Sequence, residues 1–173
     1  MNETLNTMLT RKSVKQYKSD PVPKELIEQI VEAGIHAPSG LNMQSPIILA
    51  VTNKEVRDEL SRLNAGDDPF KRNDPFYGAP VVLVVLAKKD VPTHVYDGSR
   101  VMENLLLAAH SLGLGACWIH RARETFEKPE GKALLKKLGV EEEYEGIGNC
   151  IVGYADVDPV KKPRKENRVY YVE

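Results

Sequence analysis

Residues 81–87 read VVLVVLA, which is the strongest strand signal in the chain. The run is short, rich in β-branched residues, and bounded by Pro80 on one side and by charged residues on the other. Further strand patterns occur at 46–52, 115–119 and 146–155, and helical patterns stand among them without strict strand–helix alternation. This order favours an α+β fold in which a β-sheet is covered by helices.

The helical patterns are amphipathic, with apolar residues three or four positions apart. The predicted helices are one that carries Leu5, Met8 and Leu9 on a shared face, one from Pro23 to about Gly34, one over 54–66, one that Asp97 opens and Gly113 closes, and a short one near 129–138. Residues 67–80 contain three prolines and several Asp and Asn residues, which predicts a loop. A length of 173 residues predicts one domain over 1–173.

Two segments lack cover of their own and point to a second copy of the chain. The helix predicted over 97–112 is apolar almost all round, so it needs apolar partners on every side. The tail 155–173 is too polar and too rich in proline to form a core by itself. In a chain of this size we expect another subunit to cover part of the helix.

The composition is that of a soluble globular protein, with 42% hydrophobic and 28% charged residues. The net charge of -1 and the 6% aromatic content argue against nucleic acid and anionic membranes as partners. The first residues show no signal-peptide pattern, and no run approaches 18 apolar residues, so we expect a cytoplasmic protein. Cys117 and Cys150 have no CxxC spacing and are expected to lie reduced in the core.

Several familiar motifs can be set aside. GLGACW (113–118) leads from a helix into a strand, which is the reverse of the order in a dinucleotide-binding fingerprint, and GIGNCIVG (146–153) lies inside a strand pattern. The four histidines have no metal-ligand spacing, so no metal is expected. No GxSxG or other nucleophile motif is present.

Two basic clusters stand at opposite ends of the sequence. TRKSVKQYK (10–18) places a guanidinium, a hydroxyl and an ammonium group within five residues, as a phosphate-binding segment would. Such a cluster can equally be a solvated basic turn. KKPRKENR (161–168) taken by itself would be a mobile tail. The two clusters fit one phosphate if the fold brings them together.

HAPSGLNMQSP (36–46) connects a helical pattern to a strand and is rich in neutral hydrogen-bonding groups. These groups can form local turn hydrogen bonds within a connecting loop. They can also recognise a ligand edge that carries donors and acceptors without imposing charge on it.

The chain resembles the short members of the nitroreductase family of FMN-dependent oxidoreductases. The segments that carry the resemblance are RKSVKQYK (11–18), HAPSGLNMQSPIILAV (36–51), YGAPVVLVV (77–85), ENLLLAAHSLGLGACWI (103–119) and KPRK (162–165). They occur in the family's order and with its spacings, from about Thr10 to the C-terminus. The resemblance implies a mixed central sheet with helices on both sides, in an intertwined homodimer whose C-terminal extension, residues 155–173, wraps the partner.

The resemblance also implies FMN as cofactor and assigns residues to it. Arg11 and Ser13 would hold the phosphate and ribityl chain, with Lys12 acting through its backbone. Lys15 would lie near the pyrimidine edge, where an ammonium stabilises the charge of the reduced flavin. Trp118, Ile119 and His120 would pass the flavin, with the His120 backbone N–H meeting N5. The remaining positions are Pro38, Ser39, Gly40, Asn42 and Gln44 from the other subunit, Asn73 at the flavin edge, Arg164 and Lys165 at the phosphate, and Arg168 as a weaker match there.

The activity implied by the resemblance is hydride transfer from NADH or NADPH onto flavin N5, followed by reduction of a nitroaromatic, quinone or similar acceptor. The two substrates would use the same flavin face in turn, in a ping-pong mechanism, and no acid–base side chain is required. The alternatives are a flavin-binding or sensing protein with little turnover and a specialised flavin reaction such as reductive dehalogenation. This sequence departs from the family after Asn73: DPF (74–76) stands where some members carry a further lysine.

Overall fold

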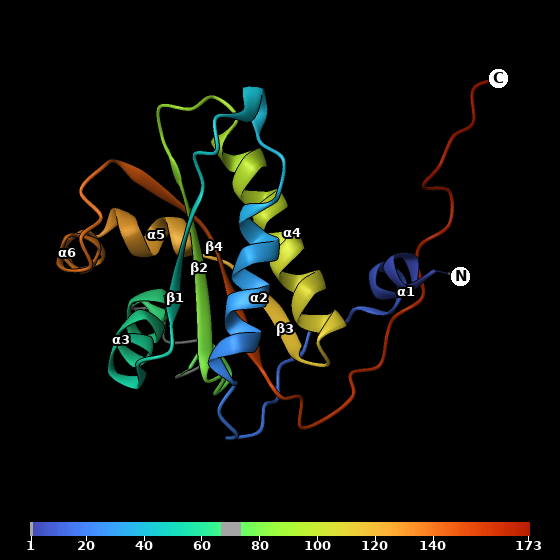
Figure 1. The fold of residues 1–173 in the computed structure, drawn as a ribbon, viewed down its shortest axis with the longest axis horizontal. Coiled ribbons are helices and arrows are strands. Elements are labelled where there is room, and N and C mark those ends of the chain that lie inside the picture. Colours follow the sequence, from blue (N-terminus) through green and yellow to red (C-terminus); the bar gives the residue numbers. More distant parts are fainter. Residues whose placement is uncertain (1, 67–73) are drawn as a thin grey trace.

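A computed structural model of the chain describes residues 2–66 and 74–173 (Figure 1). The elements follow one another as α1 (Glu3–Thr10), α2 (Lys24–Ile35), the 3₁₀ turn η1 (Gly40–Asn42), β1 (Ile47–Val51), α3 (Lys54–Ala65), β2 (Val81–Lys88), α4 (His94–Ser111), β3 (Gly115–Ile119), α5 (Ala122–Glu127), α6 (Pro129–Lys137) and β4 (Tyr144–Gly153). The expected strands and helices are present within one or two residues of their predicted bounds, with the differences given below.

The strands form one sheet in the order β1-β2-β4-β3, and each neighbouring pair is antiparallel. Ser13 adds an isolated parallel bridge to Ala116 at the β3 edge. The α+β class is therefore confirmed. In the described part of the chain, the mixed character of the sheet is limited to that bridge.

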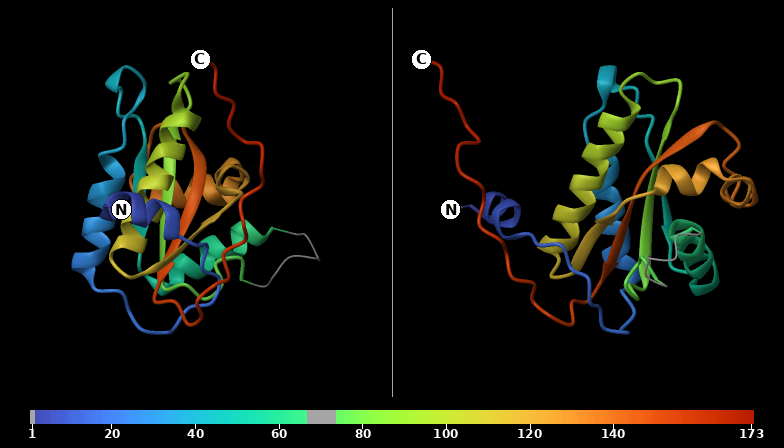
Figure 2. Two further views of the ribbon diagram at one scale, coloured as in Figure 1. Left: turned by 90° about the vertical axis from the view of Figure 1, so that its right-hand side faces the viewer. Right: turned by 180° about the vertical axis from the view of Figure 1, so that it is seen from behind.

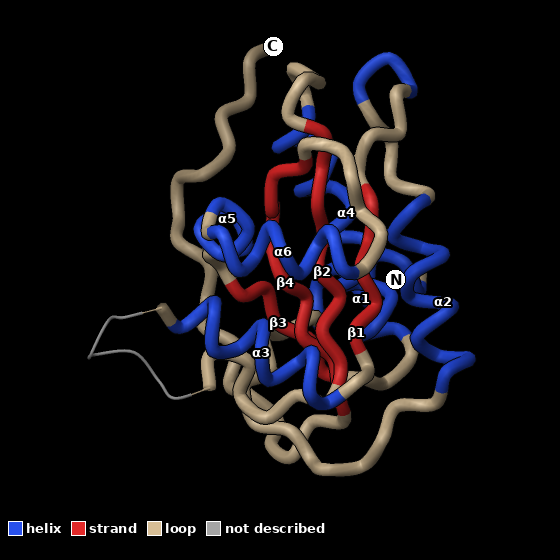
Figure 3. The backbone as a smooth tube through the Cα atoms, turned by 90° about the vertical axis from the view of Figure 1, so that its left-hand side faces the viewer, coloured by secondary structure: helices blue, strands red, loops and turns tan. Residues whose placement is uncertain are grey.

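Strand β2 is buried on both faces. Val82, Val84 and Leu86 belong to one core cluster, whereas Leu83 and Val85 belong to the other. This alternation follows from the period of two in an extended chain. Helices α2 and α4 cover one face, and α3, α5 and α6 cover the opposite face, as Figure 3 shows from the side of the second layer. The expected helices on both sides of the sheet are present.

Helix α4 begins at His94, so the prediction that Asp97 opens it is wrong. Asp97 lies inside the first turn and is 1% exposed. Its carboxylate accepts the Gly40 N–H at 2.9 Å and the Thr93 hydroxyl at 2.7 Å. The residue therefore fastens the 38–44 loop to the start of α4. An acidic side chain in the first helical turn is also favoured by the helix dipole, which explains why it resembled a start signal.

Helix α5 was not predicted from the sequence. It has six residues, and its N-cap position is Arg121, which has a left-handed backbone (φ 73°) and makes no side-chain capping hydrogen bond. A helix this short shows little periodicity, and Arg121 is not one of the usual capping residues. Both sequence signals on which the prediction relied are therefore missing.

The expectation that α4 needs cover on every side is not met within one chain. Val101, Met102 and Leu105 are buried against the sheet and α2, but Arg100 and Glu103 on the outer side are exposed. Helix α1 buries no residue, and its apolar side chains are 49–57% exposed. Residues 156–173 leave the body beside α1 (Figure 2). No helix in the described ranges is long and apolar enough to cross a membrane.

Candidate functional site

The segment 11–15 is laid along the edge strand β3. The Val14 N–H donates to the Ala116 carbonyl at 3.0 Å, and the Val14 side chain is buried. Gly115 makes this approach possible, since a Cβ there would lie 2.8 Å from Val14 Cγ2. Neighbouring residues of an extended segment point to opposite sides, so Ser13 and Lys15 face away from the core.

The charged groups of this segment have different partners. Arg11 Nε lies 3.7 Å from Glu103 Oε1, and Lys12 Nζ lies 2.6 Å from Asp158 Oδ1. Burial raises the pKa of the Cys117 thiol, and the Ser13 hydroxyl, Lys15 and Arg11 oppose that rise. Three of the predicted flavin-site residues, Arg11, Ser13 and Lys15, therefore act on Cys117 of β3. The Lys12 side chain is engaged by a carboxylate, which leaves its backbone as the group available for the predicted role.

The turn after β3 is fixed by buried polar side chains. Three successive carbonyls, of Ile119, His120 and Arg121, each accept a hydrogen bond from a side chain that is at most 3% exposed. The donors are Asn149 Nδ2 to Ile119 O at 3.4 Å, Asn64 Nδ2 to His120 O at 2.9 Å, and Thr125 Oγ1 to Arg121 O at 2.8 Å. A trans peptide directs its N–H opposite to its carbonyl, so the N–H groups of His120 and Arg121 point away from these donors.

A cavity of about 380 Å³ adjoins this turn. It is lined by Lys15, Asn64, Pro75, Tyr77, Trp118, Ile119, His120 and Arg121. Four of the predicted site residues are therefore brought together: Lys15, Trp118, Ile119 and His120. The sequence did not indicate the other four residues of the lining, which are Asn64, Pro75, Tyr77 and Arg121. The described lining includes the basic residues Lys15 and Arg121 and no carboxylate.

Tyr77 reaches the cavity because Asp74 clamps the loop that carries it. The ring of Tyr77 lies 5.7 Å from Lys15 Nζ, and its backbone has a positive φ of 55°. The Asp74 carboxylate accepts hydrogen bonds from Arg57 Nη2 at 2.5 Å, Ser61 Oγ at 2.7 Å, Phe76 N at 2.9 Å and Gly78 N at 2.6 Å. Burial opposes ionisation of Asp74, but these hydrogen bonds outweigh it and hold the pKa of the carboxyl below its usual range. The sequence DPFYG indicated a turn but not its partners on α3.

The loop 38–44 lies beside the first turn of α4, whereas β3 follows the last turn of that helix (Figure 1). Ser39 Oγ accepts the Gln44 N–H at 2.9 Å, and Gln44 Nε2 donates to Asn42 Oδ1 at 3.0 Å, so local turn hydrogen bonds do form. The close approach that Gly40 permits is to Thr93, whose Oγ1 would lie 2.5 Å from an added Cβ. Within one chain, this loop does not line the cavity beside Lys15. Pro38 accepts a hydrogen bond from Arg100 Nη1 at 3.3 Å.

In the single chain, the C-terminal cluster reaches the end of α1 only through Lys161, and none of its residues lines the cavity that contains Lys15. Arg164, Lys165 and Arg168 are exposed on the outgoing tail (Figure 2). Lys161 contacts the Leu9 carbonyl at the end of α1. Asn73 falls outside the described residues.

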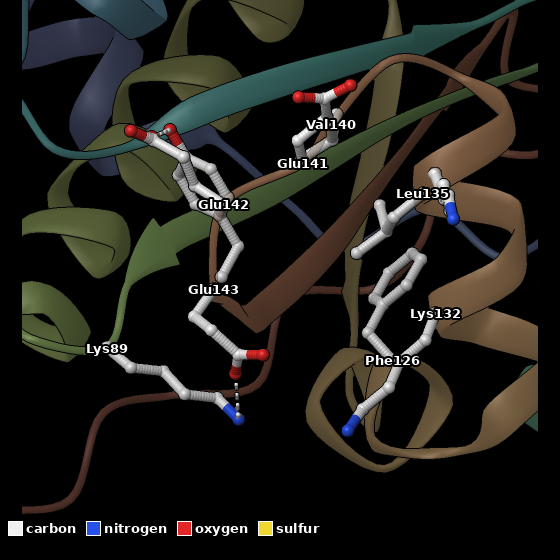
Figure 4. Close-up of a pocket in the computed structure, with 10 residues that line it drawn as sticks. Lys89, Phe126, Lys132, Leu135, Val140, Glu141, Glu142 and Glu143 are labelled. Atoms are coloured by element: carbon white, nitrogen blue, oxygen red, sulfur yellow. Dashed lines mark hydrogen bonds and ion pairs between the residues drawn. The ribbon is translucent and has the colours of Figure 1, made fainter.

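A further cavity of about 340 Å³ lies between α5, α6 and the start of β4 (Figure 4). Phe126, Leu135 and Val140 form its apolar part, and Lys89 Nζ lies 3.8 Å from Glu143 Oε2 at its mouth. It contains none of the predicted site residues. The described part of the chain holds no cluster of His, Cys, Asp and Glu residues able to bind a metal ion.

The chain forms an α+β sheet between two layers of helices, with a cavity that contains Lys15 and Arg121 beside the edge strand β3. The sequence model that describes the nitroreductase family matches residues 8–154, and the chain belongs to that family. Nitroreductases with bound FMN from Bacteroides fragilis and Desulfitobacterium hafniense have TM-scores of 0.89 and 0.90, at 29% and 28% identity, with 100% of each chain covered. The resemblance found in the sequence is thereby confirmed.

Curated relatives agree with this assignment. The NADPH-flavin oxidoreductase of Vibrio harveyi is 28% identical over 175 residues, which cover 95% of this chain and 70% of that protein. The chain spans 60% of the length of a relative from Methanothermobacter thermautotrophicus, at 32% identity over 120 residues.

Replacing Asp74 with Asn should lower the free energy of unfolding by about 2–4 kcal/mol, because Arg57 is only 8% exposed and loses its 2.5 Å ion pair with Asp74. Chemical denaturation measures this loss. The control is Asp58→Asn, since Asp58 also contacts Arg57 at 3.1 Å but is exposed, and about 0.5 kcal/mol is expected there. The Asp74 carboxyl has a lowered pKa, so its stabilisation exists above the unfolded pKa of about 3.9 and is lost as pH falls through the folded value. Equal losses for the two variants would contradict the clamp.

Proposed function

We propose that this protein is an FMN-dependent oxidoreductase that takes hydride from NADH or NADPH and reduces a nitroaromatic, quinone or similar small acceptor. The observation that carries the proposal is the meeting of the 11–15 segment, the fixed 119–121 turn and the cavity at the β3 edge. FMN-bound nitroreductases that align over the whole chain support FMN as the cofactor. When bound, FMN accepts hydride at N5 and passes electrons onward.

The residues present fit FMN in their chemistry. Arg11 and Ser13 offer a guanidinium and a hydroxyl for a phosphate, which prefers charge-assisted hydrogen bonds. Lys15 lines the cavity with an ammonium group that stabilises negative charge on a reduced ring. The His120 N–H points away from its buried neighbours and is free to meet a ring nitrogen. Each of these groups binds, orients or stabilises, and none has to exchange a proton.

The second half of the site comes from a second copy of the chain in this proposal. Pro38, Ser39, Gly40, Asn42 and Gln44 would approach the flavin of the partner. Apolar side chains left exposed in one chain support such a dimer, because a surface patch of this kind marks an interface. They are Leu5, Met8 and Leu9 on α1, and Leu41 and Met43 within the 38–44 loop.

The tail 155–173 would wrap the partner in the same assembly. Its Arg164 and Lys165 would then supply the second phosphate cluster, with Arg168 as a weaker candidate. Nearly every residue of this tail is exposed in one chain, although it carries Val160, Tyr170 and Tyr171. Donor and acceptor would use the same flavin face in turn, which gives ping-pong kinetics.

Anaerobic addition of NADH to the purified, FMN-loaded protein should bleach the visible flavin absorption. A nitroaromatic or a quinone added afterwards should restore it, since electrons leave by the same cofactor. Absorption spectra recorded after each addition provide the measurement. A flavin that stays oxidised with both NADH and NADPH would contradict the oxidoreductase proposal and favour a flavin-binding protein without turnover.

Arg11→Glu should weaken FMN binding by about 2–5 kcal/mol, because it places a carboxylate against the phosphate and removes a charge-assisted bond. Riboflavin, which lacks the phosphate, should lose much less affinity. Fluorescence titration of both flavins measures the difference, and Arg62→Glu on the exposed side of α3 is the control for charge reversal. Losses of the same size for FMN and riboflavin would show that Arg11 does not meet the phosphate.

A shared site can be tested by complementation between two defective chains. An Arg11→Glu chain and an Asn42→Asp chain should each bind FMN poorly as homodimers. In a heterodimer, one site carries both defects and the other carries neither, so about half of the FMN sites should return. FMN content of heterodimers isolated with two different tags measures this. If verified heterodimers regain no FMN, each chain builds its own site.

A further inference from the structure

Arg121 is the cavity residue for which the proposed flavin contacts give no role. The phosphate, the pyrimidine edge and N5 are assigned to Arg11, Lys15 and the His120 N–H. Arg121 lines the same cavity and is half-buried. Its Nε is buried and has no hydrogen-bond partner in the part of the chain that the structure describes. A buried guanidinium nitrogen without a partner is costly, so it indicates a ligand that supplies the missing acceptor.

The backbone at Arg121 is held in a conformation that glycine adopts at lower cost. Its φ is 73°, and two hydrogen bonds to its carbonyl, from Thr125 N at 3.0 Å and Thr125 Oγ1 at 2.8 Å, keep it there. Left-handed backbone in a residue with a long side chain is uncommon and occurs most often at functional sites. An arginine therefore stands at a backbone position that a glycine would occupy with less strain.

The electrostatic surroundings favour an anion. Lys15 lines the cavity with Arg121, and the described lining contains no Asp or Glu. The next arginine in sequence behaves differently: Arg123 is exposed, and its Nε lies 2.9 Å from Glu127 Oε1. Of two arginines in one short segment, one has its charge balanced by a carboxylate, whereas the other lines a cavity whose described residues include Lys15 but no carboxylate.

We propose that Arg121 binds a carboxylate of the electron acceptor, so that the preferred acceptors are small aromatic carboxylates. The inference rests on the proposed flavin function, because the acceptor must lie over the flavin beside this wall. A guanidinium matches a carboxylate with two parallel hydrogen bonds, which fixes the orientation of the ring as well as its affinity.

The binding test compares benzoate with benzamide, which have nearly the same shape and differ in charge. Isothermal calorimetry on the FMN-loaded protein gives both dissociation constants without any turnover. Wild type should bind benzoate at least tenfold more tightly than benzamide. Arg121→Gln should abolish most of that preference, Arg121→Lys should keep part of it, and Arg123→Gln, which removes the same charge two residues away, should keep it fully. An unchanged preference in Arg121→Gln overturns the proposal.

The kinetic test compares 4-nitrobenzoate with 4-nitrobenzamide as acceptors. In Arg121→Gln, the ratio of kcat/KM for the two should fall about tenfold or more, through KM for the nitrobenzoate. Equal losses for both acceptors, together with a shifted reduction potential of bound FMN, would mean that Arg121 acts on the flavin and would overturn the proposal. A loss confined to KM for NADH, and absent with the phosphate-free donor 1-benzyl-1,4-dihydronicotinamide, would assign Arg121 to a donor phosphate and would also overturn it. Failure of the flavin function would appear separately, as no turnover of either acceptor.

Discussion

The burial of β2 on both faces is the constraint on which the rest of the structure depends. Every residue from Val81 to Ala87 is at most 2% exposed, so neither face of this strand can meet water. Two separate layers of helices are therefore required, and they come from different parts of the chain. With β2 and β4 in the middle of the order β1-β2-β4-β3, strand β3 is left at an edge. An edge strand has unpaired backbone groups, and the segment 11–15 approaches β3 there.

The candidate site obtains its rigidity from polar groups inside the apolar layers. Asn64, Thr125 and Asn149 lie among buried residues, where an unpaired amide or hydroxyl would be costly. Each is paired with a backbone carbonyl of the turn after β3. The same hydrogen bonds that satisfy these side chains therefore fix the direction of the N–H groups on the cavity side. The same three hydrogen bonds therefore contribute both to the packing of the core and to the geometry of the candidate site.

Sequence reasoning succeeded where the signal is local. The VVLVVLA run and the amphipathic periods of α2 and α3 gave the right elements, since burial patterns repeat at each strand and helix. It failed where a residue has a distant partner. Asp97 looked like a helix start, although its carboxylate holds Gly40, and nothing near Asp74 in sequence indicated Arg57 on α3. The grouping of Arg11, Ser13 and Lys15 needed knowledge of the family, because composition alone allows a solvated basic turn. The loop 38–44 and the tail 155–173, which we propose act on a second chain, cannot be placed by the pattern of a single chain.

The distribution of charge links the two ends of the site. The whole chain has a net charge of -1, yet Arg11, Lys12 and Lys161 all act on His110 beside the β3 edge, where Glu103 and Asp158 pair with the first two. The pKa of His110, whose ring is hydrogen-bonded to the Thr10 hydroxyl at 2.8 Å, responds to these charges. Burial lowers its pKa, and Arg11, Lys12 and Lys161 lower it further. The imidazole therefore stays neutral at pH 7 and adds no further charge to a region that is already cationic. Binding of phosphate or carboxylate at this edge should therefore weaken as ionic strength rises, because salt screens the attraction between exposed charges.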